Sequence, residues 1–189
     1  ECKVQSPKST YIAGDLGDWA AAQEELGKLD VESAIEQAST LRWRLAEVQY
    51  GLGHLDAALK AVDEAIAKAV DVRSHADELQ ARLLKVRILA AMKREREARA
   101  ELAVVKQGLV RYASVPLRLR LAETSLLLGG AQATADYREA RILLARLPAY
   151  GHAFMIHQLG ARAAQAGSDS GREAQSLARE AFEAMLKQT

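Results

Sequence analysis

The chain has 189 residues, enough for one domain or one short repeat array, and 49% of them are hydrophobic although only 5% are aromatic. Its 26 basic and 25 acidic residues give a formal net charge of +1, which argues against a nucleic-acid-binding domain, because such domains usually gather a basic excess on one face. No apolar run approaches the length of about 18 residues that a membrane-spanning helix needs, so we expect no membrane insertion.

The composition predicts an all-α fold. Ala, Leu, Glu, Arg, Lys and Gln dominate, whereas long runs of the β-branched and aromatic residues that favour strands are missing. Because the chain begins at Glu1 rather than Met, we expect a processed product or a fragment of a larger protein. The single cysteine, Cys2, cannot form an internal disulfide and favours the cytoplasm, although many periplasmic proteins also lack disulfides.

Taken in order, the chain predicts five units, each with two amphipathic helices around a turn. In the first unit a turn at Gly17-Asp18 precedes a helix that starts at Trp19. The second unit is the clearest, because Gly53-His54 separates two helices with apolar residues at i, i+3 and i+4 spacing. The five units span residues 1–30, 33–72, 75–112, 115–148 and 149–189.

The later units depart from this regular pattern. The third has helices near 75–92 and 95–111, and the fourth starts at Pro116 and turns at Gly129-Gly130. Residues 131–135 are interpreted as an insertion that delays the next helix until Asp136. The fifth has helices near 150–166 and 171–187. Oxygen-bearing side chains followed three residues later by glutamate predict helix caps at Ser33, Asp136 and Ser170.

One pattern of small and apolar residues recurs in all five units. An alanine is followed four residues later, and three later again, by an apolar residue, and successive alanines lie 36, 40, 42 and 34 residues apart. Periods of this size indicate solenoid repeats, in which each unit is too small to bury its own apolar face and stacks on the next. The five sets are Ala22, Leu26 and Leu29; Ala58, Val62 and Ala65; Ala98, Leu102 and Val105; Ala140, Leu144 and Leu147; Ala174, Ala178 and Ala181.

The second unit resembles a tetratricopeptide repeat. Its matches to that family are a large-then-small pair, a turn glycine and the second-helix signature: Leu45, Ala46, Gly53, Ala58, Val62 and Ala65. The chain departs from the family in its longer spacings, in Lys93 at a turn-glycine position and in Lys85 at a usually apolar position. The resemblance implies a single domain over 1–189, a right-handed α-solenoid of about five antiparallel pairs. Within that family, the chain is most similar to the degenerate arrays attached to bacterial signalling proteins and transcription regulators.

In arrays of this family the first helices of successive units line a concave groove. The resemblance therefore implies a groove in which aromatic anchors lie beside mixed charges, suited to a docked peptide or helix. The residues that it places there are Trp43, Glu47, Tyr50, Leu83, Arg87, Leu119, Glu123 and His157. The alternative interpretation is that Trp43 and Tyr50 pack between helices, and that His157 is packed or capped in the same way.

No residue pattern in the sequence indicates catalysis. The chain lacks a G-x-x-x-x-G-K-[ST] phosphate loop, and Gly129-Gly130 lacks the further glycines of a phosphate cradle. The four histidines contain no H-x-x-x-H pair, and the only cysteine is distant from them. We therefore expect no enzyme, no metal site and no cofactor.

Three functions are compatible with this sequence. The leading hypothesis is a non-catalytic scaffold that binds a partner protein or peptide. The second is a small-molecule-sensing module of a bacterial transcription regulator or kinase, which a closed apolar pocket would favour. The third is self-association as a homodimer, because a shortened first unit would leave apolar residues near Ile12, Leu16 and Trp19 exposed.

Overall fold

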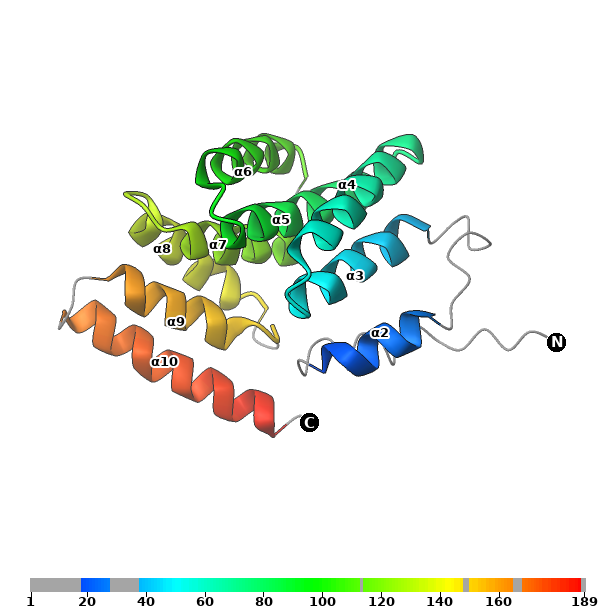
Figure 1. The fold of residues 1–189 in the computed structure, drawn as a ribbon. Helices are drawn as coiled ribbons and strands as arrows, with labels where there is room; N and C mark the ends of the chain where they lie inside the picture. The colour runs from blue at the N-terminus through cyan, green and yellow to red at the C-terminus, as the bar shows by residue number, and fades with distance from the viewer. Residues whose placement is uncertain (1–17, 28–37, 113, 148–149, 165–167, 188–189) are drawn as a thin grey trace. The chain divides into compact units, whose positions relative to one another are not determined.

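The structure is a computed structural model that describes residues 18–27, 38–112, 114–147, 150–164 and 168–187. Throughout these residues the regular structure is helical, so the predicted all-α fold is confirmed, and neighbouring helices pack on one another. In chain order (Figure 1) the helices are α2 (Trp19–Gly27), α3 (Ala38–Gly51), α4 (Leu55–Asp71), α5 (His75–Ala91), α6 (Glu95–Val110), α7 (Val115–Leu128), α8 (Ala133–Leu144), α9 (Ala153–Ala163) and α10 (Asp169–Leu186).

The chain divides into two compact units. Unit 1 is Glu1–Glu101 and unit 2 is Leu102–Thr189, so the boundary falls within α6. No helix in the described ranges is long and apolar enough to cross a membrane. The cap expected at Ser33, together with Cys2, Ile12 and Leu16, lies outside the described residues.

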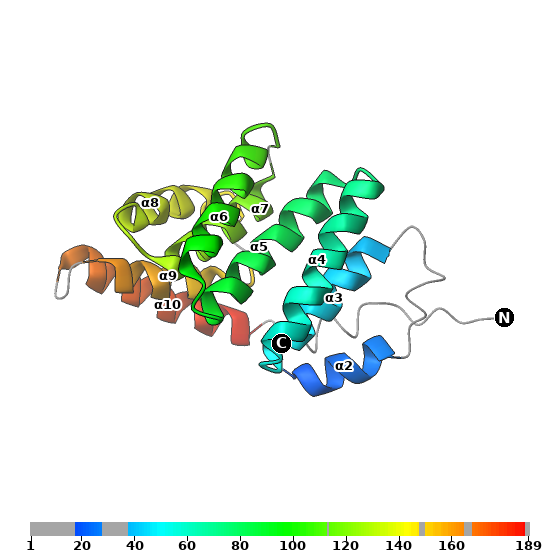
Figure 2. The same ribbon diagram turned by 45° about the horizontal axis from the view of Figure 1, so that its top comes forward.

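Unit 1 is built from neighbouring helices that pack face to face. The α3 helix packs on both α2 and α4, and α5 packs on α4, as Figures 1 and 2 show. The core of the α3–α5 layer is made largely of small and β-branched side chains, including Ala46, Ala58, Val62 and Ala65. Such residues let helix axes approach closely, which is what a chain poor in aromatics requires.

Unit 2 contains the C-terminal part of α6 and the four helices that follow it. The α7, α8 and α9 helices pack on one another, and α10 packs on α9. Their core is centred on Leu119, Ala140, Ile156 and Ala174. In both units the recurring alanines are the most buried part of the pattern: Ala22, Ala58, Ala98, Ala140 and Ala174 are each at most 1% exposed.

The predicted turns of the second to fourth units lie where the sequence placed them, whereas Gly17 in the first unit and Gly167 in the fifth lie outside the described residues. Gly53 adopts φ +80° between α3 and α4, and Gly129 and Gly130 follow α7 with φ +64° and +114°. Lys93, in the turn between α5 and α6, takes the same left-handed conformation with φ +62°. A residue with a Cβ atom is strained there.

Two predicted helix caps are wrong. The α10 helix is capped by Ser168, whose hydroxyl accepts a hydrogen bond from the Gly171 amide at 3.2 Å, and Ser170 lies inside the first turn. The α8 helix begins at Ala133, so the supposed insertion is partly helical. Asp136 lies within that helix, and its carboxylate contacts residues of α6 and α7 instead of capping the helix.

Candidate functional site

The predicted groove residue Trp43 lies in the core of unit 1. Its side chain is 3% exposed, and the guanidinium of Arg44 covers its ring at 4.2 Å from the ring centroid. Arg44 donates to the carboxylate of Glu47 at 2.6 Å. The expectation of an exposed aromatic anchor at this position is therefore corrected: Trp43 packs between helices, the alternative that the sequence left open.

Tyr50 and Arg87 come together from adjacent helices. The guanidinium of Arg87 in α5 lies 5.5 Å from the ring centroid of Tyr50 in α3, and both side chains are half-buried. Leu83, one turn before Arg87, is buried and faces the core. Of the residues predicted for unit 1, Tyr50, Arg87 and Glu47 thus retain surface that another molecule can reach.

The predicted residues of unit 2 are all buried. Leu119 is 0% exposed, and Glu123 is buried with its carboxylate 3.4 Å from the Nδ1 atom of His152. His157 lies between helices, where its Nδ1 atom and the hydroxyl of Tyr137 form a hydrogen bond of 2.9 Å. An exposed groove surface at Leu119, Glu123 and His157 is therefore corrected as well.

The environment of His157 favours its neutral form. Burial lowers the pKa of the imidazole below its ordinary value, and the nearby charge of Arg141 lowers it further against a weaker opposing effect of Glu180. Burial also raises the pKa of the Tyr137 phenol. The pair is therefore uncharged near neutral pH and is a packing element of the core.

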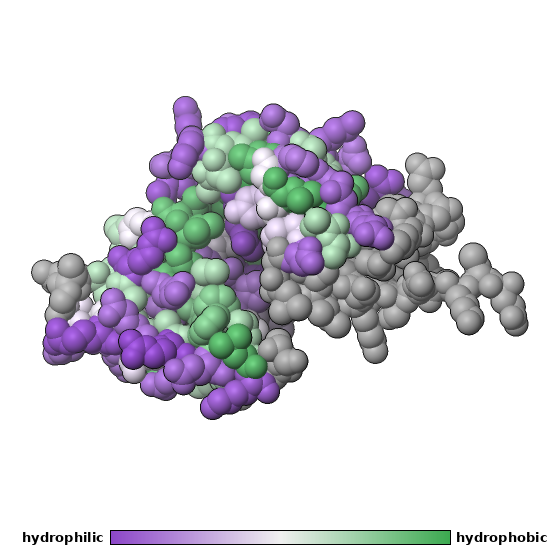
Figure 3. Space-filling view, turned by 60° about the horizontal axis from the view of Figure 1, so that its bottom comes forward, coloured by the Kyte–Doolittle hydropathy of each residue, from purple (hydrophilic) through white to green (hydrophobic). Residues whose placement is uncertain are grey.

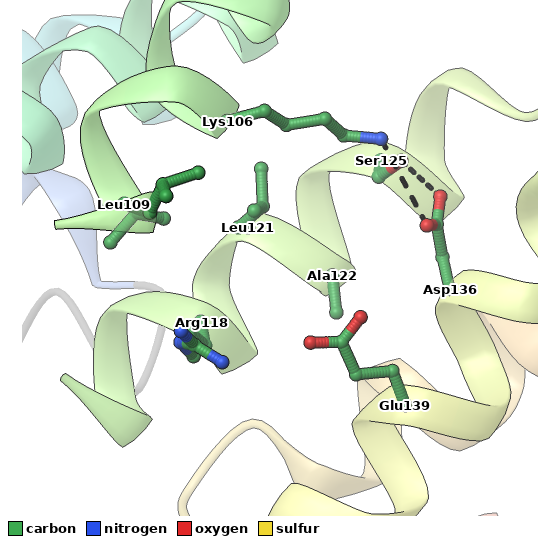
Figure 4. A pocket seen from close by; sticks show the side chains of 9 residues that line it. Lys106, Leu109, Arg118, Leu121, Ala122, Ser125, Asp136 and Glu139 are labelled. Carbon is green, nitrogen blue, oxygen red and sulfur yellow. Dashed lines mark hydrogen bonds and ion pairs between the residues drawn. The ribbon is translucent and has the colours of Figure 1, made fainter. Parts of the chain in front are cut away.

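A hollow that the sequence did not reveal lies between α6, α7 and α8 in unit 2 (Figure 4). Its volume is about 240 Å³. Leu109, Leu121 and Ala122 supply apolar walls, and Val110, 80% exposed, stands at its edge. Val110 therefore adds exposed aliphatic surface to the apolar wall of the hollow, and another molecule can cover both.

At one end of this hollow, the charge of the Asp136 carboxylate is balanced by Lys106. The hydroxyl of Ser125 donates to the Asp136 carboxylate, and the Nζ atom of Lys106 lies 3.9 Å from the same carboxylate (Figure 4). This inter-helix contact explains why Asp136 does not act as a cap. It ties α7 to α8 at that end and leaves the apolar walls as the open part of the hollow.

The other end carries two charges of opposite sign. Arg118 comes from α7, and Glu139 extends from α8 toward the same side of the hollow. Within the described part of the chain neither side chain forms an ion pair. The hollow therefore combines an aliphatic centre with a rim that can contact either charge of a docked group.

In the described ranges no group of three or more His, Cys, Asp or Glu side chains is placed so that it could hold a metal ion. Comparison with known proteins adds no relative. No family model, no curated protein and no solved structure matches the chain.

Sequence reasoning missed the α6–α8 hollow for a physical reason. Its residues come from three helices and share no spacing along the chain. The one available signal was the adjacent pair Leu109-Val110 close to the end of a helix. Leu109 is 3% exposed and Val110 is 80% exposed, but Leu83-Leu84 and Leu143-Leu144 are pairs of the same kind with both residues buried, so such a pair alone does not identify an exposed residue.

Proposed function

We propose that this chain is a non-catalytic protein-interaction module, built as a right-handed solenoid of tetratricopeptide-like helix pairs and acting in a reducing compartment of a bacterial cell. The support for the repeat is the regular burial of the five motif alanines. A fold of this kind holds partner-contacting side chains on rigid helices, which lowers the entropic cost of binding.

The observation that carries the proposal is the α6–α8 hollow with Val110 at its edge. Its volume of about 240 Å³ lies below the usual range of about 300–1,000 Å³ for small-molecule sites and suits one or two inserted side chains. We therefore propose that an aliphatic side chain of the partner enters between Leu109 and Leu121. Arg118 and Glu139 then orient flanking charges of the partner.

The polar surface at Tyr50 and Arg87 in unit 1 is a second contact region under this proposal. Arginine stacked on tyrosine is a common element of binding hot spots, because the pair offers a large and rigid surface. Trp43 belongs to the core cluster against which Tyr50 packs. Arg87→Glu is consequently a cleaner test than Trp43→Ala, which would disturb the core.

The test is affinity capture from a lysate of the source cell, followed by calorimetry with the captured protein. We compare the wild type with Val110→Glu and with Ile142→Glu, a control at a 63% exposed aliphatic residue of α8 outside the hollow. A partner held by the wild type and the control, and bound at least tenfold more weakly by Val110→Glu, is expected, since a hot-spot contact is worth about 1–2 kcal/mol or more. Equal capture by all three proteins would contradict the proposal.

Small-molecule sensing is the second candidate, and the observation on its side is the apolar wall of the same hollow, although its volume of about 240 Å³ is smaller than most small-molecule sites have. A metabolite there would stabilise the folded chain by about 2.7 kcal/mol at one hundred times its Kd. Thermal unfolding across a metabolite panel distinguishes the two candidates. A shift that Val110→Glu abolishes would favour sensing over protein binding.

A further inference from the structure

A second and larger hollow lies between α9 and α10 in unit 2. Its volume is about 780 Å³. Its walls include the small residues Ala161 and Ala178, which leave the space between the two helices open. The hollow shares no residue with the α6–α8 hollow, so its chemistry is independent of that site.

The ionisable groups that line this hollow are both arginines. Arg162 comes from α9 and Arg179 from α10, and no acidic side chain lines the hollow within the described residues. Both arginines are exposed, and neither forms an ion pair in the described part of the chain. Each wall of the hollow therefore presents a guanidinium that no carboxylate of the described residues pairs with.

Three of the four acidic residues of α10 have partners outside the hollow, and the fourth, Glu183, does not line it. Asp169 pairs with Arg172 one turn along the same helix, and the carboxylate of Glu173 lies 2.6 Å from Arg141 in α8. Glu180 accepts a hydrogen bond from the hydroxyl of Ser176 at 3.1 Å. The absence of acid from the hollow thus follows from how the chain distributes its carboxylates.

An aromatic ring lies at the α10 side of the hollow. Phe182 is 43% exposed, and its ring packs against the edge of Phe154 with centroids 5.7 Å apart and an interplanar angle of 65°. This contact holds the ring in place while leaving part of its face to solvent. In the region of α9 and α10, Figure 3 shows hydrophobic residues among hydrophilic ones.

From these contacts we infer that the α9–α10 hollow docks an acidic segment of a partner protein, with carboxylates against Arg162 and Arg179 and one apolar side chain against Phe182. Paired arginines recognise carboxylates through charge-assisted hydrogen bonds. The exposed amides of Gln158 and Gln175 line the same hollow and can both donate to and accept from an extended peptide backbone.

The charge pattern favours a protein segment over nucleic acid. Nucleic-acid sites carry many cations that follow a phosphate backbone. The charged and polar residues that line this hollow are only two arginines and two glutamines, beside one apolar ring. The formal net charge of the whole chain is only +1. The inference rests on the proposed protein-binding function but uses a different surface.

The test is calorimetric titration with a synthetic decapeptide of alternating glutamate and aspartate around one central leucine, beside its lysine and arginine counterpart. We expect the acidic peptide to bind and the basic one not to bind. The double variant Arg162→Gln/Arg179→Gln should weaken binding at least tenfold, and Phe182→Ala should weaken it less.

The matched control is Arg138→Gln/Arg146→Gln. It removes the same charge from two exposed arginines of unit 2 that do not line the hollow, and it should bind the acidic peptide as the wild type does. Equal loss in both double variants would overturn the inference, because the attraction would then be that of net charge alone. No binding of the acidic peptide by the wild type would overturn it too.

Two other occupants are tested alongside the peptide. Equally tight binding of a thymidine 20-mer, lost in the Arg162→Gln/Arg179→Gln variant, would assign the hollow to nucleic acid and overturn the inference. A wild-type dimer in sedimentation that the same variant converts to a monomer would assign it to a second copy of the chain, with the same consequence. Since Val110→Glu leaves this hollow intact, failure here and failure of the proposed function are distinguishable.

Discussion

Unit 1 and unit 2 each place a helix glycine directly against an aromatic ring, yet they hold the two rings differently. A Cβ atom on Gly51 would lie 2.1 Å from the ring of Trp19, and one on Gly160 would lie 2.4 Å from the ring of Tyr137. Trp19 is half-buried at the start of α2, whereas Tyr137 is in the core of unit 2 and hydrogen-bonded to His157. A glycine packed against an aromatic ring should therefore matter less for stability in unit 1 than in unit 2. The half-buried ring of Trp19 has solvent to turn into, whereas the ring of Tyr137 is enclosed by the core of unit 2.

The largest expected effect comes from adding a methyl group at these two positions. Gly160→Ala should destabilise unit 2 by about 2–3 kcal/mol, since overpacking against a fixed ring forces neighbouring helices apart. Gly51→Ala should cost about 1 kcal/mol, because Trp19 can turn toward solvent. Urea unfolding followed by circular dichroism measures both.

Gly151→Ala is the control for this comparison, because a Cβ atom there has no neighbour within 4 Å. It should change stability by less than about 0.5 kcal/mol. Equal losses at Gly51 and Gly160 would show that the freedom of the two rings does not differ as the structure indicates.

The second expected effect distinguishes the units by their response to acid. Burial lowers the pKa of His157 in the folded state, so the unfolded state binds more protons below about pH 6.5, the ordinary pKa of histidine. The stability that neutral His157 contributes is present above that pH and is lost as the pH falls through the lower, folded-state pKa. The urea midpoint of the wild type should therefore drop between pH 7.5 and pH 5.

His157→Gln removes the titrating group and keeps a side chain that can bond to Tyr137. Its urea midpoint should be lower than that of the wild type at pH 7.5 but should change less on acidification. An equally steep acid dependence in this variant would assign the effect to other groups, among which His152 beside Glu123 is the first to examine.

The smallest expected effect concerns the turns of unit 1. Lys93→Gly should stabilise the chain by about 0.5–1 kcal/mol, because glycine adopts φ +62° without the strain that a Cβ atom brings. Gly53→Ala should have the opposite sign, since Gly53 has φ +80°. Thermal unfolding measures both.

Lys60→Gly, in the exposed middle of α4, is the control for Lys93→Gly and should destabilise by about 1 kcal/mol. If Lys93→Gly were also destabilising, the lysine side chain would stabilise the folded chain by more than the positive φ at position 93 costs.

The sequence predicted the helices well because their signals are local. The spacing of Ala58, Val62 and Ala65 marks a buried stripe wherever the helix packs, and the glycines at the ends of α3 and α7 mark turns without any tertiary contact. Helix α8 was placed late because Asp136 satisfies every local requirement of a cap. The packing of α7 beside α8 brings the hydroxyl of Ser125 to the carboxylate of Asp136. Only this tertiary contact shows that Asp136 joins two helices instead of capping one.

The site residues were harder to predict because exposure is a property of neighbours. The family pattern put Trp43, Leu119 and His157 on an open face, and in this chain other helices and the Arg44 side chain cover them. The two hollows depend on which side chains are small or turned away, such as Ala161 and Ala178. Neither property has a period along the chain.

The burial of Trp43 has a spectroscopic consequence. The chain has two tryptophans, Trp19 and Trp43, and both belong to unit 1. Intrinsic indole emission during unfolding therefore reports on unit 1 alone, and the enclosed Trp43 should shift to longer wavelength when water reaches it. Unit 2 contributes helix but no indole, so an ellipticity curve that separates from the emission curve would identify two folding units in one chain.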